Sequence, residues 1–237
     1  RCVYETAIST VLTTPKGRVV DFLTVGARPD HLYCLTSEGR QQAVIDWIEF
    51  YTFGEDSSVY DVTRDTAQIT VTGPEASGIL KRLGCGVPNA KPFSLFESNL
   101  GGVPTLIWNT LSSGEESFEL ITEGDEVSKI RESLINAGSI PISENVWDSL
   151  RVTNGVPVYG AEYGEHTNPL ESRLRGSISF DKGCYIGQEV IVRLDTYRKV
   201  QRQLMALVLS GPATPGDQLT LDERPVGVLT SVSPGLS

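Results

Sequence analysis

The sequence predicts an α+β fold, and three observations support this class. A pattern of two strands, a helix and a further strand occurs twice between residues 17 and 143. The strand segments are rich in β-branched and aromatic residues, whereas the helix segments carry apolar residues three and four positions apart. After about residue 200 only short strand patterns follow. We therefore expect two related α+β layers, each a sheet with helices on one face, and a small antiparallel β-barrel at the C-terminal end.

The two copies of the repeated unit keep nearly the same register. Gly101 follows Gly17 by 84 residues, and Ser117 follows His31 by 86. Two matching offsets favour duplication over coincidence. The first copy is expected to contain strands at Gly17–Val25, His31–Thr36 and Ser58–Thr63 and a helix at 39–53. The second is expected to contain strands at Gly101–Asn109, Ser117–Thr122 and Ser139–Ser143 and a helix at 125–137.

The segments outside the repeat suggest how the chain divides into domains. An alternating strand and turn at Gln68–Pro74 precede a helix at Glu75–Leu83, which Gly84 ends. The three short C-terminal strands, expected to form an incomplete barrel, lie at Gln203–Leu209, Gln218–Leu221 and Val226–Val232. We accordingly expect a first α+β unit at 1–64, a second at 65–197 and the barrel at 198–237.

Composition and charge exclude several classes of function. No apolar run approaches the roughly 18 residues that cross a membrane. The chain has 30 acidic and 20 basic residues, a net charge of −10, which repels phosphate backbones and argues against direct binding of nucleic acid. Its cysteines lie far apart, at Cys2, Cys34, Cys85 and Cys184, so neither a zinc site nor another permanently bound metal is expected. Reduced thiols and an intracellular location are the default.

The most informative segment is Lys182–Glu189, which reads K-G-C-Y-I-G-Q-E. Apolar residues at helical spacing follow from Ile186, which predicts a helix entered through Gly183. Cys184 would then lie in the first turn, two residues from the ammonium of Lys182. The helix dipole and the ammonium both favour a thiolate, so Cys184 and Lys182 are the candidate catalytic residues. The alternative is a buried cysteine with a purely structural role at an ordinary helix start.

Other motifs accompany this octapeptide. They are W-D-S-L-R-V-T-N-G-V-P-V-Y-G at Trp147–Gly160, P-K-G-R-V-V-D at Pro15–Asp21 and T-G-P at Thr72–Pro74. Together these motifs resemble the YgfZ family of folate-binding proteins, relatives of the glycine-cleavage T-protein, the GcvT aminomethyltransferase. The segment Arg193–Leu204 is most similar to the cyanobacterial and plastid branch. The resemblance implies two ferredoxin-like layers and a barrel around a central opening, in a chain that is short at both ends.

The resemblance also implies a set of contacts to tetrahydrofolate or a derivative of it. Asp21 matches the aspartate that the T-protein uses against its folate substrate; alternatively, it lies on the exposed face of an alternating strand. Arg151 follows an apolar residue in a strand or at a helix edge and could pair with the glutamate tail of a folate; alternatively, it is a surface salt-bridge partner. Arg193 has the alternative role of a helix-dipole partner, and Gln188 that of fixing the signature loop. The complete set of candidate folate contacts is Asp21, Trp147, Arg151, Thr153, Tyr185, Gln188 and Arg193.

Two departures from the T-protein pattern argue against aminomethyl transfer. Thr153 stands where the T-protein has a glutamate, and a threonine cannot ionise to pair with a pterin or take a proton. The aromatic G-Y-T-G-E hairpin of the T-protein is altered to L-S-S-G-E at Leu111–Glu115. A folate-shaped pocket remains compatible with both changes.

Three functions follow from these patterns, and whether the protein is an enzyme stays open. The first is a folate-binding accessory factor for assembly or repair of iron–sulfur proteins, supporting four-iron–four-sulfur enzymes such as those that modify transfer RNA. The second is a folate-dependent one-carbon transferase, and the third a binding module without folate. Expected partners are a reduced folate and iron–sulfur assembly or client proteins. The chloroplast stroma is the favoured location, with the mitochondrial matrix or a bacterial cytoplasm as alternatives.

Overall fold

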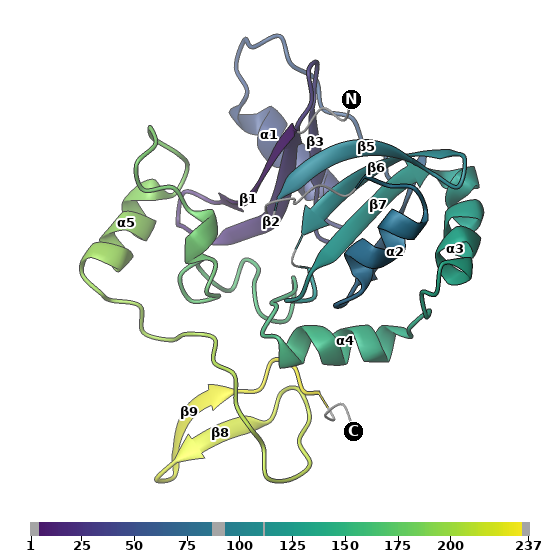
Figure 1. The fold of residues 1–237 in the computed structure, drawn as a ribbon. Coiled ribbons are helices and arrows are strands. Elements are labelled where there is room, and N and C mark those ends of the chain that lie inside the picture. The colour runs from purple at the N-terminus through teal and green to yellow at the C-terminus, as the bar shows by residue number, and fades with distance from the viewer. Residues whose placement is uncertain (1–4, 87–92, 111, 234–237) are drawn as a thin grey trace. The chain divides into compact units, whose positions relative to one another are not determined.

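The computed structural model describes residues 5–86, 93–110 and 112–233 (Figure 1). Cys2 and Leu111 of the sequence predictions lie outside these ranges. The chain forms two compact units. Unit 1 takes in residues up to Ser9, Thr24–Leu35 and Gln41–Glu144; unit 2 takes in Thr10–Leu23, Thr36–Arg40 and the residues from Asn145 on. The predicted domain division at 64/65 and 197/198 stays a prediction.

The main sheet has seven strands in the order β3-β2-β1-β5-β6-β7-β4. Its strands are β1 (Glu5–Thr13), β2 (Val19–Ala27), β3 (Leu32–Leu35), β4 (Thr66–Thr72), β5 (Ser94–Leu100), β6 (Val103–Thr110) and β7 (Ser117–Glu123). Two three-stranded meanders meet where β1 pairs antiparallel with β5, and β4 pairs antiparallel with β7 at one edge. Each meander is followed by a helix, α1 (Gln41–Tyr51) or α3 (Val127–Asn136), and α3 is entered through the short η1 (Gly124–Glu126). The predicted repeat of hairpin and helix is confirmed, and each copy has an additional first strand, β1 or β5.

The core of unit 1 lies between the sheet and two helices. Figure 1 shows α2 (Ala76–Arg82) and α3 beside the strands β5, β6 and β7. Leu80 of α2 and Ile130 of α3 are buried in one apolar cluster with Phe96 and Phe118 of the sheet. The opposite face of the sheet buries a second cluster around Trp108. The amphipathic pattern of the helices and the alternation of the strands therefore place α2 and α3 on one face of the sheet, as expected for the second copy. The strands of the two copies, expected in two separate sheets, form a single one.

Two predicted strands of the repeat do not form. Residues 58–63 and 139–143 have no regular secondary structure, and most of their side chains are exposed. A strand needs a partner for its backbone groups, and for residues 139–143 the edge of the sheet beside β7 is already occupied by β4. Residues 139–143 instead lead into a helix, α4 (Glu144–Thr153).

Unit 2 consists mainly of loops and two helices. They are α4 and α5 (Gln188–Thr196), with the short η2 (Arg175–Ser177) between them. Its core packs Val19, Tyr163 and Leu174 together with partly buried apolar neighbours. No helix within the described ranges is both long and apolar enough to cross a membrane.

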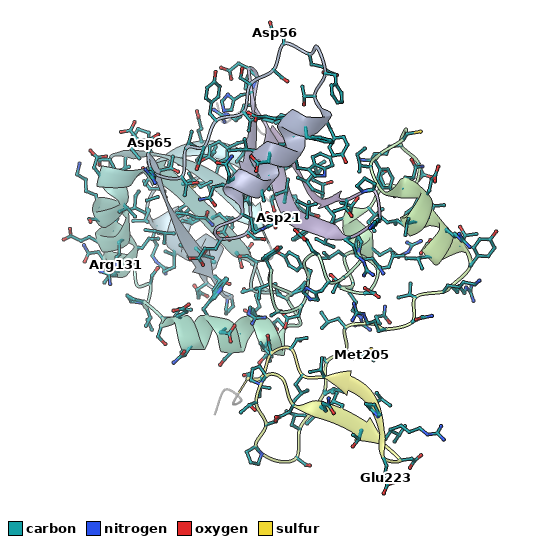
Figure 2. The ribbon with its side chains drawn as sticks, turned by 180° about the vertical axis from the view of Figure 1, so that it is seen from behind. Asp21, Asp56, Asp65, Arg131, Met205 and Glu223 are labelled. Carbon is teal, nitrogen blue, oxygen red and sulfur yellow. The ribbon has the colours of Figure 1, made fainter. Side chains whose placement is uncertain are left out.

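The C-terminal segment forms a two-stranded antiparallel sheet of β8 (Gln218–Leu221) and β9 (Arg224–Val228). Glu223 lies at the turn between these strands, at the tip of the hairpin (Figure 2). The expected strand at Gln203–Leu209 does not form, and the described part of the segment contains no closed sheet. The predicted barrel is therefore not confirmed, because two strands cannot close on themselves.

Candidate functional site

The signature Lys182–Glu189 is a loop that leads into α5, rather than the first turn of a helix. The helix begins at Gln188, and its N-cap Gly187 has the left-handed φ of +83°. Cys184 therefore precedes the helix by four residues, and the predicted first-turn position is wrong. The apolar spacing describes α5 correctly. It contains no signal for a left-handed residue, so it does not reveal that the helix begins only after Gly187.

Contacts with the turn between β1 and β2 hold this loop in place. The Thr13 hydroxyl donates a hydrogen bond to the Ile186 carbonyl at 2.5 Å. A Cβ atom at Gly187 would lie only 2.6 Å from the Thr14 carbonyl oxygen. Gln188 accepts a hydrogen bond from the Tyr185 N–H through its side-chain oxygen at 3.2 Å, in keeping with the loop-fixing role considered for it.

Cys184 lines an open groove of about 540 Å³ along α5. The other lining residues are Gln188, Glu189, Val192, Arg193, Thr196 and Tyr197. Cys184 is exposed, so the alternative of a buried structural cysteine is wrong. The Lys182 ammonium lies 5.2 Å from the ring centroid of Tyr185, whose hydroxyl is buried without a hydrogen-bond partner among the described residues. Burial raises the pKa of Tyr185. The structure thus brings an accessible thiol and two cationic side chains into one loop and helix.

Asp21, on β2 (labelled in Figure 2), is fully buried, so the alternative that it lies on an exposed strand face is wrong. Its Oδ1 accepts hydrogen bonds from the Phe22 N–H at 2.8 Å and from the Ser37 hydroxyl at 2.5 Å. Its Oδ2 accepts one from the Ser37 N–H at 3.0 Å. All three donors are neutral, and no ion pair with Asp21 is found in the described part of the chain. A buried carboxylate without a cation is costly, which makes the position a candidate for function.

A cluster of aromatic side chains is linked to this carboxylate through Ser37. The Tyr163 hydroxyl lies 2.8 Å from the Ser37 hydroxyl, and its ring contacts Phe22 and Tyr159 edge to face. Burial raises the pKa of Tyr163 to about 12. The Arg40 guanidinium stacks 4.4 Å over the Tyr159 ring. The sequence did not predict roles for Ser37, Arg40 and Tyr163, because they come from separate segments and no periodic pattern joins them.

The predicted folate contacts of α4 lie in different environments. Arg151 is buried, which contradicts the alternative of a surface ion pair. Its guanidinium donates to Asp148 at 2.5 Å, to Glu162 at 3.2 Å and to the Ser231 hydroxyl at 2.9 Å. These internal partners occupy much of the guanidinium that was expected to bind a folate tail. At the other positions of the helix, Trp147 is half-buried and Thr153 is exposed.

Unit 1 contains a second buried carboxylate, Glu119 of β7, that the sequence did not reveal. It accepts hydrogen bonds from Gln68 at 2.8 Å, from the Thr70 hydroxyl at 2.6 Å and from the Thr110 hydroxyl at 3.3 Å. Trp108, its cross-strand neighbour, has a buried indole N–H without a partner in the described ranges. The Glu119 carboxylate can accept a further hydrogen bond from an N–H donor. No group of three or more histidine, cysteine, aspartate or glutamate side chains is arranged to hold a metal ion within those same ranges.

Comparison with known proteins connects these features with one family. The chain is 31% identical, over 228 residues, to a chloroplastic protein of Arabidopsis thaliana that carries the name of a transferase; this match covers 95% of the chain and 53% of that protein. It is 29% identical to an aminomethyltransferase of Herpetosiphon aurantiacus, covering 93% of the chain and 62% of the relative. The chain thus spans less than two thirds of the length of these relatives.

The fold is also found in a solved structure. The glycine cleavage system aminomethyltransferase T from Bartonella henselae superposes with a TM-score of 0.79 at 18% identity, over 95% of the chain and 63% of that protein. At the level of sequence, the family model named GCVT N-terminal domain matches residues 3–182. The chain therefore belongs to the GCVT family.

Proposed function

We propose that this protein binds a reduced folate through unit 2 and acts as an accessory factor in the assembly or repair of iron–sulfur proteins. The observation that carries the folate part is the buried carboxylate of Asp21, contacted only by neutral donors in the described part of the chain. A pterin offers N–H groups and a flat ring, which a carboxylate and nearby tyrosines can recognise. Membership of the GCVT family supports this ligand class, because GcvT aminomethyltransferases use tetrahydrofolate.

The iron–sulfur part of the proposal rests on the similarity of K-G-C-Y-I-G-Q-E to the YgfZ family and on the exposed thiol of Cys184. An accessible thiol in a groove can handle sulfur or contact a client protein. The clients would be four-iron–four-sulfur enzymes, including those that modify transfer RNA, so that any link to RNA is indirect. The chloroplastic relative supports the chloroplast stroma as the location.

A folate-dependent one-carbon transferase is the second candidate. The names of the aminomethyltransferase relatives and the buried Asp21 favour it. Thr153 opposes it, because this exposed side chain replaces a carboxylate with a group that cannot ionise. A binding module without folate is the third candidate.

Titration with 5-formyltetrahydrofolate tests the folate part directly. We expect saturable binding to the purified chain. In the Asp21→Asn variant the binding free energy should weaken by about 1–3 kcal/mol, the range for a hydrogen bond to a charged group. Asp181→Asn is the matched control, because Asp181 is an exposed carboxylate in the same unit. Absence of binding by the unmodified chain would favour the third candidate. Equal affinity in the two variants would remove Asp21 from the site.

Two further assays separate the accessory factor from the transferase. Methylene transfer between tetrahydrofolate and an aminomethyl carrier should be undetectable, and its detection would establish the second candidate. The Cys184→Ser variant should fold normally but fail to restore iron–sulfur enzyme activity in a strain that lacks the family member. Full activity of that variant would contradict the role of Cys184.

A further inference from the structure

The hydrogen bonds around Asp21 define how many acceptor positions remain for a ligand. An ionised carboxylate only accepts hydrogen bonds, and each oxygen offers about two acceptor positions. Phe22 and the Ser37 hydroxyl occupy both positions of Oδ1, and the Ser37 N–H occupies one position of Oδ2. Among the contacts that the described residues make, one position on Oδ2 is left.

The same contacts define the direction of the hydrogen bonds beyond Asp21. Ser37 has a single hydroxyl proton, and the carboxylate takes it. The Tyr163 hydroxyl, 2.8 Å from the Ser37 oxygen, must therefore be the donor of their shared hydrogen bond. Tyr163 thus donates to Ser37, and Ser37 donates to Asp21; all three residues belong to unit 2.

We propose that Tyr163 and Ser37 are positioning residues that hold Asp21 as an ionised acceptor with one free position, on Oδ2, for an N–H donor of the ligand. The proposal rests on the proposed function for the identity of that ligand, a reduced folate. It selects ligands that donate an N–H group at this point over ligands that only accept. Because Tyr163 acts through Ser37, removing its hydroxyl should weaken binding less than removing that of Ser37.

The surroundings keep Tyr163 a donor at neutral pH. Burial is the main cause that raises the pKa of Tyr163 to about 12, and the charges of Asp21 and Glu162 raise it further, whereas the contact with the Ser37 hydroxyl lowers it. The other charged or titratable groups near the ring are Tyr159 and, stacked over Tyr159, Arg40. Linked hydrogen bonds polarise one another, so the phenol strengthens the bond that Ser37 donates to Asp21.

A titration of the tyrosines tests the hydrogen-bond chain without any ligand. In protein labelled with ¹³C at the tyrosine ζ position, the Tyr163 signal is identified by its loss in Tyr163→Phe. It should remain unshifted at a pH near 11, where exposed tyrosines have ionised. Asp21→Asn should move its titration to lower pH, because the variant removes a negative charge that raises the pKa of Tyr163. Titration of Tyr163 with the exposed tyrosines, or an unchanged midpoint in Asp21→Asn, would overturn the chain.

Calorimetric titration with 5-formyltetrahydrofolate then tests the positioning role. We expect Ser37→Ala to weaken binding about tenfold and Tyr163→Phe to weaken it a few-fold, whereas Ser37→Thr, which keeps the hydroxyl, restores the affinity. Unchanged affinity in Ser37→Ala, or no recovery in Ser37→Thr, would overturn the positioning role. If the unmodified chain fails to bind this folate, the proposed function fails, while the tyrosine titration still decides whether the chain of hydrogen bonds exists.

Discussion

At the scale of single residues, buried carboxylates are the clearest sign of function in this protein. Asp21 and Glu119 are both almost completely removed from solvent, and only neutral donors contact them among the described residues. Hydrogen bonds from neutral groups offset part of the cost of burying a charge, but they do not remove it. A fold selected for stability alone would favour apolar side chains at these positions.

The burial of Tyr163 should make the stability of the protein fall at alkaline pH. Its pKa is about 12 in the folded state, against about 10 in the unfolded state. Between these values the folded state keeps a proton that the unfolded state has lost, so stability declines as pH rises. From pH 9 to 11 the unmodified protein should lose about 1.4 kcal/mol more than Tyr163→Phe. Urea unfolding at both pH values measures this difference, and equal losses would show that Tyr163 titrates normally.

Cys184 should be the most reactive of the three cysteines that the structure describes. Cys34 is exposed, but desolvation by its surroundings raises the pKa of its thiol. Cys85 is buried. Iodoacetamide at pH 7 should therefore alkylate Cys184 first, as peptide mapping over time would reveal. Using a Cys2→Ser background keeps the terminal cysteine out of the comparison. Faster labelling of Cys34 would show that the groove shields the Cys184 thiol.

At the scale of elements, Gly187 is essential for the junction between the signature loop and α5. It has a left-handed φ, and a Cβ would collide with the Thr14 carbonyl. Gly187→Ala should therefore reduce the free energy of unfolding by about 2–4 kcal/mol, since left-handed strain and a backbone clash add. Gly183→Ala is the matched control, because no atom lies within 4 Å of its added Cβ. A similar loss of stability in both variants, measured by urea unfolding, would contradict this role of Gly187.

The elements also show which parts of the fold can be predicted from sequence. Periodicity predicted the strands β2, β3, β4, β6, β7 and β8 and the helices α1, α2, α3 and α5, because each has a regular apolar pattern. It missed the helix α4 and the strands β1 and β5, where glutamate, serine and asparagine interrupt the strand signal. It wrongly predicted strands at 58–63 and 139–143; for the second, apolar content does not reveal that β4 already occupies the edge beside β7.

The candidate site was predictable only where a motif marked it. The octapeptide pointed to Lys182 and Cys184, and the early P-K-G-R-V-V-D motif pointed to Asp21. Ser37 contacts Asp21, and Tyr163 contacts Ser37, from segments that are distant in the sequence. Such contacts depend on tertiary packing, and a single sequence carries no local signal for them.

At the scale of the whole molecule, charge argues against a direct role on RNA. The chain carries a net charge of −10, whereas affinity for nucleic acid comes largely from cations that replace the counterions of the phosphates. We therefore expect transfer RNA to bind more weakly than about 10 μM at physiological salt, with a shallow dependence on salt concentration.

Fluorescence anisotropy with labelled transfer RNA between 50 and 200 mM salt tests this expectation. A lysine-rich peptide measured under the same conditions controls for the competence of the RNA, because its affinity must fall steeply as salt rises. A submicromolar Kd for the protein with a similarly steep salt dependence would reveal a basic surface that the net charge conceals. Transfer RNA would then be a direct ligand, and the accessory role toward RNA-modifying enzymes would need to include RNA binding.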